Sequence, residues 1–200
     1  MASKKINIEK NQLTVPSLTD ELSTLSFISG ACNSGFKSII IGVNESGKVL
    51  GVNPVGFTTF LTEKINSTFG NSIKFSIKLQ SHEYKQYAIL SIEHVKTKPI
   101  VFISKGKVYE KMIVSGSVLP LNHLLKAFLI SEQKENLPLV SDDIFSPLEN
   151  LPSGKYTYSR FRRILKDFSI SDVDDLIVFM LRKGTASLDF ENSQTFILIL

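Results

Sequence analysis

The sequence predicts an α+β fold, a mixed, mostly antiparallel sheet packed against helices, followed by a small second unit. Apolar residues recur at helical spacing in some segments and at every second position in others. The period-two segments come in pairs joined by short polar turns, which is typical of antiparallel hairpins. A stretch rich in charged residues and proline then divides the chain. We therefore expect a domain over residues 1–132, a linker over 133–154 and a second unit over 155–200.

The first elements expected are a short strand and an amphipathic helix. Ile6 and Ile8 alternate with polar residues, which indicates a strand. Ser17 has the chemistry of a helix N-cap, and apolar residues at helical spacing follow it, so we predict a helix over 18–32. The small and polar residues 33–35 would end this helix, with Asn33 as a C-cap residue.

A hairpin and a second helix should follow. The segment IIIGVNESGKVLGV at 39–52 places two apolar runs around a polar turn, in which Gly42 and Gly47 are expected to be strand and turn glycines. A second helix is predicted over 57–69, with Gly70 at its end. After it, the expected strands are 73–79 and 90–94 in one hairpin, and 99–104 and 108–114 in another.

The remaining elements are helices and a final hairpin. Pro120 is typical of a first helical turn, so a helix is expected over 121–130. Beyond the linker we predict a helix over 159–168 and a second one, capped by Ser171, that ends near 183. The strands ASLDF and TFILIL flank the turn ENSQ. Two helices followed by a hairpin are typical of the end of a winged helix-turn-helix, so a winged-helix-like unit is expected here.

Composition restricts the class of protein. The 200 residues are 42% hydrophobic and 21% charged, which is typical of a globular chain. The single cysteine, Cys32, excludes an intramolecular disulfide and falls on the apolar stripe of its helix, so it is expected in the core. No apolar run has the length of a signal-peptide core or a membrane span. We therefore expect a cytoplasmic protein with no membrane partner.

Charge is unevenly distributed along the chain. The first 130 residues contain 15 lysines, no arginine and eight acidic residues, a net charge of +7, whereas residues 131–200 carry a net charge of −3. A basic first part is compatible with polyanion binding. In the second part, the arginines at 160, 162 and 163 share a predicted helix with Lys166, and a solvated charged face is the favoured interpretation.

Several short motifs of the first part occur in a recognisable order. Ala31-Cys32-Asn33-Ser34 precedes an apolar strand, which continues as Ile41-Gly42-Val43-Asn44-Glu45-Ser46-Gly47-Lys48-Val49-Leu50-Gly51-Val52. Later, Gly106-Lys107-Val108-Tyr109-Glu110-Lys111 is followed by Pro120 and a predicted helix. This order resembles the Schlafen-type, AlbA-like domain family over about residues 5–130. The resemblance implies an α+β domain that binds nucleic acid.

The same resemblance bears on catalysis. Schlafen nucleases resemble one another in a three-carboxylate metal site, and Glu9 and Glu45 would occupy two of its positions. Five residues before Glu9, where the family has its third carboxylate, the chain has Lys4, which would repel a divalent cation. Lys111 replaces the family arginine and keeps its charge without its bidentate fork. We therefore expect no metal, no cofactor and no metal-dependent cleavage, with residues 44–47 acting as a turn.

Non-catalytic binding of nucleic acid is the favoured function, with Lys37, Lys105, Lys107 and Lys111 as phosphate contacts. Strand alternation would place the last three on one face of a hairpin. Two alternatives stay open. One is a metal-dependent, Schlafen-like endoribonuclease with a degenerate carboxylate site at Glu9 and Glu45. The other is a protein-interaction or oligomerisation module, in which the acidic second unit binds a protein partner or a second copy. The sequence does not choose between DNA and RNA.

Overall fold

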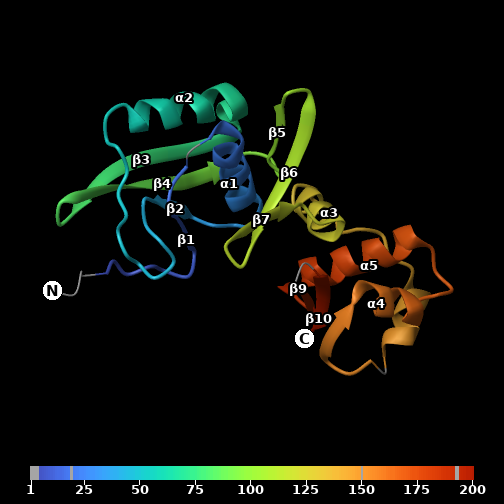
Figure 1. The fold of residues 1–200 in the computed structure, drawn as a ribbon. Helices are drawn as coiled ribbons and strands as arrows, with labels where there is room; N and C mark the ends of the chain where they lie inside the picture. The colour runs from blue at the N-terminus through green and yellow to red at the C-terminus, as the bar shows by residue number, and fades with distance from the viewer. Residues whose placement is uncertain (1–4, 19, 150, 192–193) are drawn as a thin grey trace. The chain divides into compact units, whose positions relative to one another are not determined.

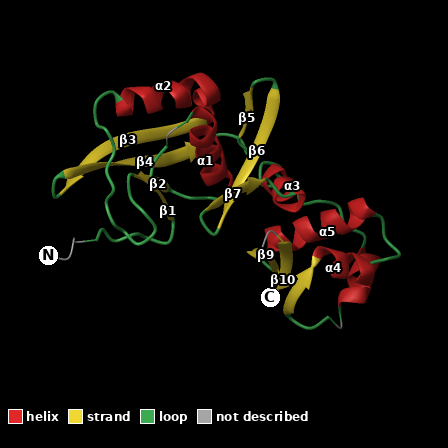
Figure 2. Cartoon of the chain, viewed as in Figure 1, coloured by secondary structure: helices red, strands yellow, loops and turns green. Residues whose placement is uncertain are grey.

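The chain folds as two units, Met1–Leu121 and Asn122–Leu200, each with its own hydrophobic core. The computed structural model describes residues 5–18, 20–149, 151–191 and 194–200. Over these residues the strands form one four-stranded and two three-stranded sheets, and helices accompany them in both units (Figures 1 and 2). The predicted α+β class is confirmed. No helix in the described part of the chain has both the length and the apolar character needed to cross a membrane.

The four-stranded sheet organises the first unit. Its strands are β1 (Gln12–Val15), β2 (Ser38–Ile41), β3 (Ile73–His82) and β4 (Lys85–Val95), in the order β1-β2-β4-β3. β1 pairs with β2 in parallel, and the other pairs are antiparallel. The parallel pair is joined by helix α1 (Glu21–Asn33), since parallel strands need a crossover connection. All four residues of β2 are buried, as expected for a central strand covered on both faces.

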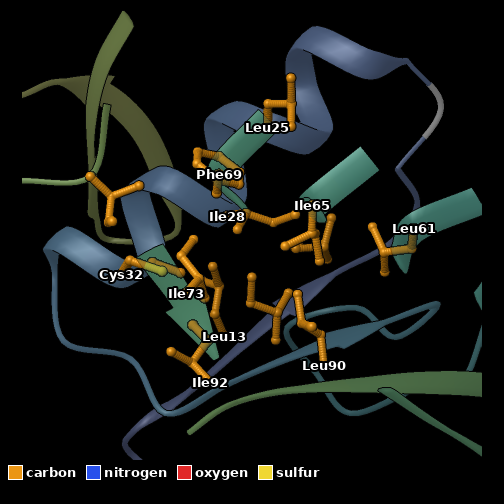
Figure 3. Close-up of a cluster of buried hydrophobic side chains, with 14 of the residues drawn as sticks. Leu13, Leu25, Ile28, Cys32, Leu61, Ile65, Phe69, Ile73, Leu90 and Ile92 are labelled. Atoms are coloured by element: carbon orange, nitrogen blue, oxygen red, sulfur yellow. The ribbon is translucent and has the colours of Figure 1, made fainter. Parts of the chain in front are cut away.

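Two helices cover one face of this sheet. Leu25 and Ile28 of α1, together with Leu61 and Ile65 of α2 (Phe57–Phe69), point toward strand residues such as Leu90 (Figure 3). The opposite face carries a smaller cluster, in which Ile6 packs against the buried residues Ile40, Val43, Val49 and Tyr87. Burial of both faces therefore depends on segments from three different parts of the first unit.

A second sheet completes the first unit. Its strands are β5 (Val101–Ser104), β6 (Lys107–Val114) and β7 (Ser117–Pro120), paired antiparallel in that order. Helix α1 lies directly against β6, because Gly30 leaves no side chain between them. A Cβ atom at Gly30 would lie 3.0 Å from Ile113 Cδ1 and 3.3 Å from the Met112 carbonyl carbon. One helix thus packs against both sheets of the unit.

The second unit has the element order helix, strand, helix, helix, strand, strand. These elements are α3 (His123–Ser131), β8 (Gly154–Thr157), α4 (Tyr158–Ile164), α5 (Ile170–Lys183), β9 (Ala186–Glu191) and β10 (Gln194–Ile199). Their sheet is antiparallel, with the order β8-β10-β9. Helix α5 begins with a capping box between Ser169 and Asp172 and ends at Gly184 in the left-handed conformation. Ser169 is therefore the N-cap in place of the predicted Ser171.

The N-terminal elements differ from the prediction. The first strand is Gln12–Val15 and not the segment around Ile6 and Ile8, because Leu13 and Val15 are the side chains buried in the main core. Helix α1 begins after Asp20, whose Oδ1 accepts a hydrogen bond from Ser23 N at 2.8 Å, and not after Ser17. Either residue type can cap a helix, so the N-cap chemistry of Ser17 alone did not identify the helix start.

The boundary between the units also differs. The predicted first domain ended at 132, whereas the chain divides after Leu121, and Pro120 ends strand β7 instead of starting a helix. Asn122 caps α3, and Leu124 of that helix is fully buried in the second core. The predicted linker 133–154 contains a 3₁₀ helix, η2 (Asp142–Leu148), with Ile144 buried in the same core. A few apolar residues in a charged, proline-rich segment are sufficient to make it part of the fold.

Candidate nucleic-acid interface

The polar turn after β2 is held by hydrogen bonds of Asn44. Its Oδ1 accepts from Ser46 Oγ at 2.8 Å and from Lys48 N at 2.9 Å, and its carbonyl accepts from Gly47 N at 2.9 Å. The predicted hairpin 39–52 is reduced to one bridge, Val43 with Val49. The reason is that both edges of β2 are already occupied, by β1 and by β4. The amide of Asn44 is therefore engaged within the turn itself.

Gly47 closes this turn against the N-terminal segment. Its φ is +78°, and its carbonyl accepts a hydrogen bond from Ile6 N at 3.0 Å. A Cβ atom at this position would lie 2.5 Å from Ile6 O, a separation that non-bonded atoms do not reach. Gly47 is thus a structural glycine for two reasons, its backbone conformation and the close approach of a second backbone.

Glu9 and Glu45 lie at opposite ends of β2. Glu9 precedes β1, at the end where β1 and β2 begin in register at Gln12 and Ser38, and its carbonyl accepts from Gln12 N. Glu45 follows the other end of β2, exposed, with its carboxylate against Gly116 of the β6–β7 turn. The N-terminal segment connects those ends, because Ile6, three residues before Glu9, bonds to Gly47, two residues after Glu45. Lys4 lies outside the described residues, and within them no three His, Cys, Asp or Glu side chains are grouped to hold a metal.

Asn33 joins α1 to the β5–β6 hairpin. Its Nδ2 donates to the carbonyls of Ile100 at 2.9 Å and Lys111 at 2.8 Å, and its Oδ1 accepts from Ile100 N at 2.7 Å. The side chain is almost fully buried, at 2% exposure. It is the last helical residue and Ser34 is the C-cap, so its predicted capping role is replaced by a long-range one. Sequence could not reveal this, since an Asn before Ser-Gly fits a helix end equally well.

Two of the predicted phosphate contacts, Lys37 and Lys111, have backbones fixed by hydrogen bonds, and Lys111 is bonded to the end of α1. The Lys111 carbonyl is bound by Asn33, and neighbouring Ile113 donates its N–H to Ser34 Oγ at 2.8 Å. Lys37 follows Asn33 by four residues, and its backbone bonds to Asn11 O at 2.9 Å and Ile92 N at 2.8 Å. Lys37 is exposed and Lys111 is half-buried. Hydrogen bonds therefore fix the backbone of both lysines.

The other two lysines lie toward the tip of the β5–β6 hairpin. Lys105 and Gly106, with φ of +48° and +73°, form the two-residue turn, so strand alternation does not place Lys105 on a face with the others. Lys107, Tyr109 and Lys111 do share a face of β6. The Tyr109 ring stacks on Phe102 at a centroid distance of 5.0 Å, and Lys111 Nζ lies 5.6 Å from its centre. This face thus combines two lysines with an aromatic ring.

Several cations of the second unit are bound within the unit. Arg162 Nη1 donates to the carbonyls of Phe168 and Ser169, and Arg182 Nη1 donates to those of Ser131 and Asn136. These bonds fix loops and draw both guanidinium groups toward the protein backbone.

Lys155 forms ion pairs with two carboxylates of β9. Its Nζ lies 2.7 Å from Asp189 and 2.5 Å from Glu191. These hydrogen bonds raise the pKa of Lys155, and its ammonium lowers the pKa of Asp189. Together with Arg162 and Arg182, Lys155 is therefore a structural cation of the second unit.

Cys32 is a core residue, as predicted, and we expect it to be chemically inert. Burial raises the pKa of its thiol to about 12, against the opposing effect of the Lys98 charge. At pH 8 Ellman's reagent should modify the native protein at least about a hundredfold more slowly than the urea-unfolded chain. In the unfolded chain the thiol ionises at its ordinary pKa of 9.0, whereas in the folded protein it ionises only at about 12. Ionisation therefore favours the unfolded chain, and the free energy of unfolding should fall as the pH rises from 9.0 toward 12. Fast native labelling would show that this helix is not packed as described.

The comparisons with known proteins identify no family. No protein-family model and no curated protein matches the chain. Among solved structures it is similar to the DIP2311 protein from Corynebacterium diphtheriae, with 8% sequence identity and a TM-score of 0.48. That alignment covers 100% of this chain and 55% of the other, so the chain spans about half the length of that protein. A likeness at this level carries no argument about function.

Proposed function

We propose that the first unit binds nucleic acid without cleaving it, through Lys37, Lys105, Lys107 and Lys111. The observation that carries the proposal is that the backbones of two of these lysines are fixed by hydrogen bonds, Lys111 to Asn33 at the end of α1 and Lys37 to Asn11 and Ile92. Lysines that neutralise phosphates release counterions, which favours binding of a polyanion. Residues 1–121 carry 14 lysines, no arginine and eight acidic residues, a net charge of +6.

The resemblance to Schlafen-type, AlbA-like domains supports the same proposal, because the matching residues occupy these elements. Asn33 and Ser34 of the Ala-Cys-Asn-Ser motif bind the hairpin that carries the Gly106–Lys111 motif. Two segments far apart in the sequence thus form one local structure.

The binding surface can be tested by charge reversal. Lys107→Glu combined with Lys111→Glu is expected to weaken binding of a 20-nucleotide single-stranded RNA or DNA at least about tenfold at low salt. The slope of log affinity against log salt concentration should also become shallower by about two. Fluorescence anisotropy measures both quantities. Lys48→Glu combined with Lys78→Glu changes the net charge equally at two other exposed positions and should have a much smaller effect.

Three outcomes would contradict the proposal. They are no binding at low salt, equal loss in both double variants, or cleavage of the oligonucleotide in Mg²⁺ or Mn²⁺ that Glu45→Ala abolishes. The last outcome would instead support the endoribonuclease alternative.

For the second unit we propose a winged helix that binds protein. The element order and the sheet order β8-β10-β9 are typical of that fold, with β9 and β10 as the wing. In this arrangement α5 would be the recognition helix, but its first turns carry Asp172, Asp174 and Asp175, which would repel phosphates.

Reversal of the charges of Arg160 and Arg163, two exposed cations of the second unit, should therefore leave oligonucleotide affinity unchanged. A loss as large as that of the Lys107 and Lys111 variant would assign the nucleic acid to this unit.

A further inference from the structure

Strand β3 is a long edge strand with a free side. Its ten residues pair with β4, and over the described residues they pair with no other strand. In an antiparallel pair, backbone N–H and C=O groups point alternately toward the partner and away from it. The outward groups of β3 are therefore available to a further strand.

A groove runs beside this edge. It has a volume of about 770 Å³ and lies between α2 and β3. Thr58, Thr62 and Asn66, spaced by four residues along α2, line one side, and the consecutive residues 73–77 of β3 line the other. Side chains of a strand alternate between the two faces of the sheet. Five consecutive residues expose backbone as well as side chains to the groove, which therefore includes the edge of the strand and extends to His94 of β4.

The charge of the groove indicates the ligand. Lys74, Lys96 and His94 line it, and none of the described residues that line it is acidic. The carboxylate of Glu93 lies 3.6 Å from Lys74 Nζ, but the Lys74 side chain is 76% exposed, so this ion pair is screened by solvent and weak. The groove therefore combines an open strand edge with positive charge, and it matches a ligand that has both a peptide backbone and carboxylates.

We propose that this groove binds an extended acidic peptide segment of a partner protein, which adds a strand to β3. The backbone of such a segment would complete the ladder, and its carboxylates would face Lys74 and Lys96. A nucleic acid has no ladder of N–H and C=O groups that could pair with the strand edge. The edge therefore favours a peptide over nucleic acid, which we propose binds at Lys37, Lys105, Lys107 and Lys111. The two proposals rest on different residues and can fail separately.

The test begins with selection of random decapeptides displayed on phage against the full chain. Enriched peptides are then synthesised with a fluorescein label, and their affinity is measured by anisotropy. We expect sequences rich in Asp and Glu that protect the amides of residues 73–79 from hydrogen exchange when bound. Lys74→Glu combined with Lys96→Glu should weaken binding at least about tenfold.

A matched pair of variants separates the groove from the rest of the helix. Asn66→Trp should block the groove and weaken peptide binding, whereas Ser67→Trp, at an exposed position of α2 outside the lining, should leave it unchanged. The proposal is overturned if no peptide is enriched, if enriched peptides protect other segments, or if the two tryptophan variants behave alike. Protection of residues 73–79 by an oligonucleotide alone would also overturn it and assign the groove to nucleic acid.

Discussion

Replacing Asn33 by alanine is expected to lower the free energy of unfolding of the first unit by about 3 kcal/mol. The change removes three hydrogen bonds to the β5–β6 hairpin and the residue before it, of which the two to Ile100 are buried and the one to Lys111 is partly buried. Ile100 N–H and the Lys111 carbonyl would then lose the partner that the side chain supplies, and an unpaired buried polar group costs about 1–3 kcal/mol. The carbonyl of Ile100 is less affected, because Ser29 Oγ also donates to it, at 2.7 Å.

Native-state hydrogen exchange of the β2 amides in urea measures this free energy for the first unit alone, which avoids assuming that both units unfold together. The matched control is Asn66→Ala, which replaces an exposed asparagine on α2 and should change stability by no more than about 0.5 kcal/mol. If the two alanine variants were equally stable, Asn33 would not be the connection between α1 and the hairpin.

The second large effect is expected at Gly47. Gly47→Ala should destabilise the first unit by about 3 kcal/mol, because it adds a collision with Ile6 O to the cost of a left-handed backbone. Gly35 offers an unusually close control, since its φ of +77° nearly equals the +78° of Gly47 but nothing lies within 4 Å of its added Cβ. Gly35→Ala should therefore cost only the backbone strain, about 1 kcal/mol.

The same exchange measurement at β2 compares the two variants. Their difference isolates the contact between the turn and the N-terminal segment, because the backbone conformation is shared. Equal destabilisation would mean that Ile6 does not pack against the turn in solution. It would also remove the support for interpreting residues 44–47 as a structural turn.

Much of the fold follows from local patterns. The helix 57–69 and its end at Gly70 match the prediction, because apolar residues at helical spacing and a glycine with positive φ act within one segment. The pairing of β5 with β6 also matches, since the Lys105-Gly106 turn specifies it locally. Elements of this kind are determined by residues close together in the sequence, so they can be predicted from it.

Where two segments have the same local pattern, the sequence does not show which of them forms the element. Residues around Ile6 and residues 12–15 both alternate like a strand, and only pairing beside β2 selects the second. The apolar run 48–52 resembles a hairpin strand, but β2 had no free edge for it. Likewise, the charged segment 133–154 joins a core because Ile144 is buried there. Each outcome depends on which surface remains available, a property of the assembled sheet and core.

Some features of the candidate interface likewise follow from the sequence, whereas others depend on the tertiary structure. Sequence alone provides the excess of lysines, the placement of Lys107 and Lys111 but not Lys105 on one strand face, and the polar turn at Asn44. Tertiary structure alone bonds the Lys111 backbone to the end of α1 and buries Asn33 between a helix and a hairpin. The physical reason is that side-chain spacing is set by the local backbone, whereas the meeting of distant residues is set by sheet register and by buried polar groups that must find partners.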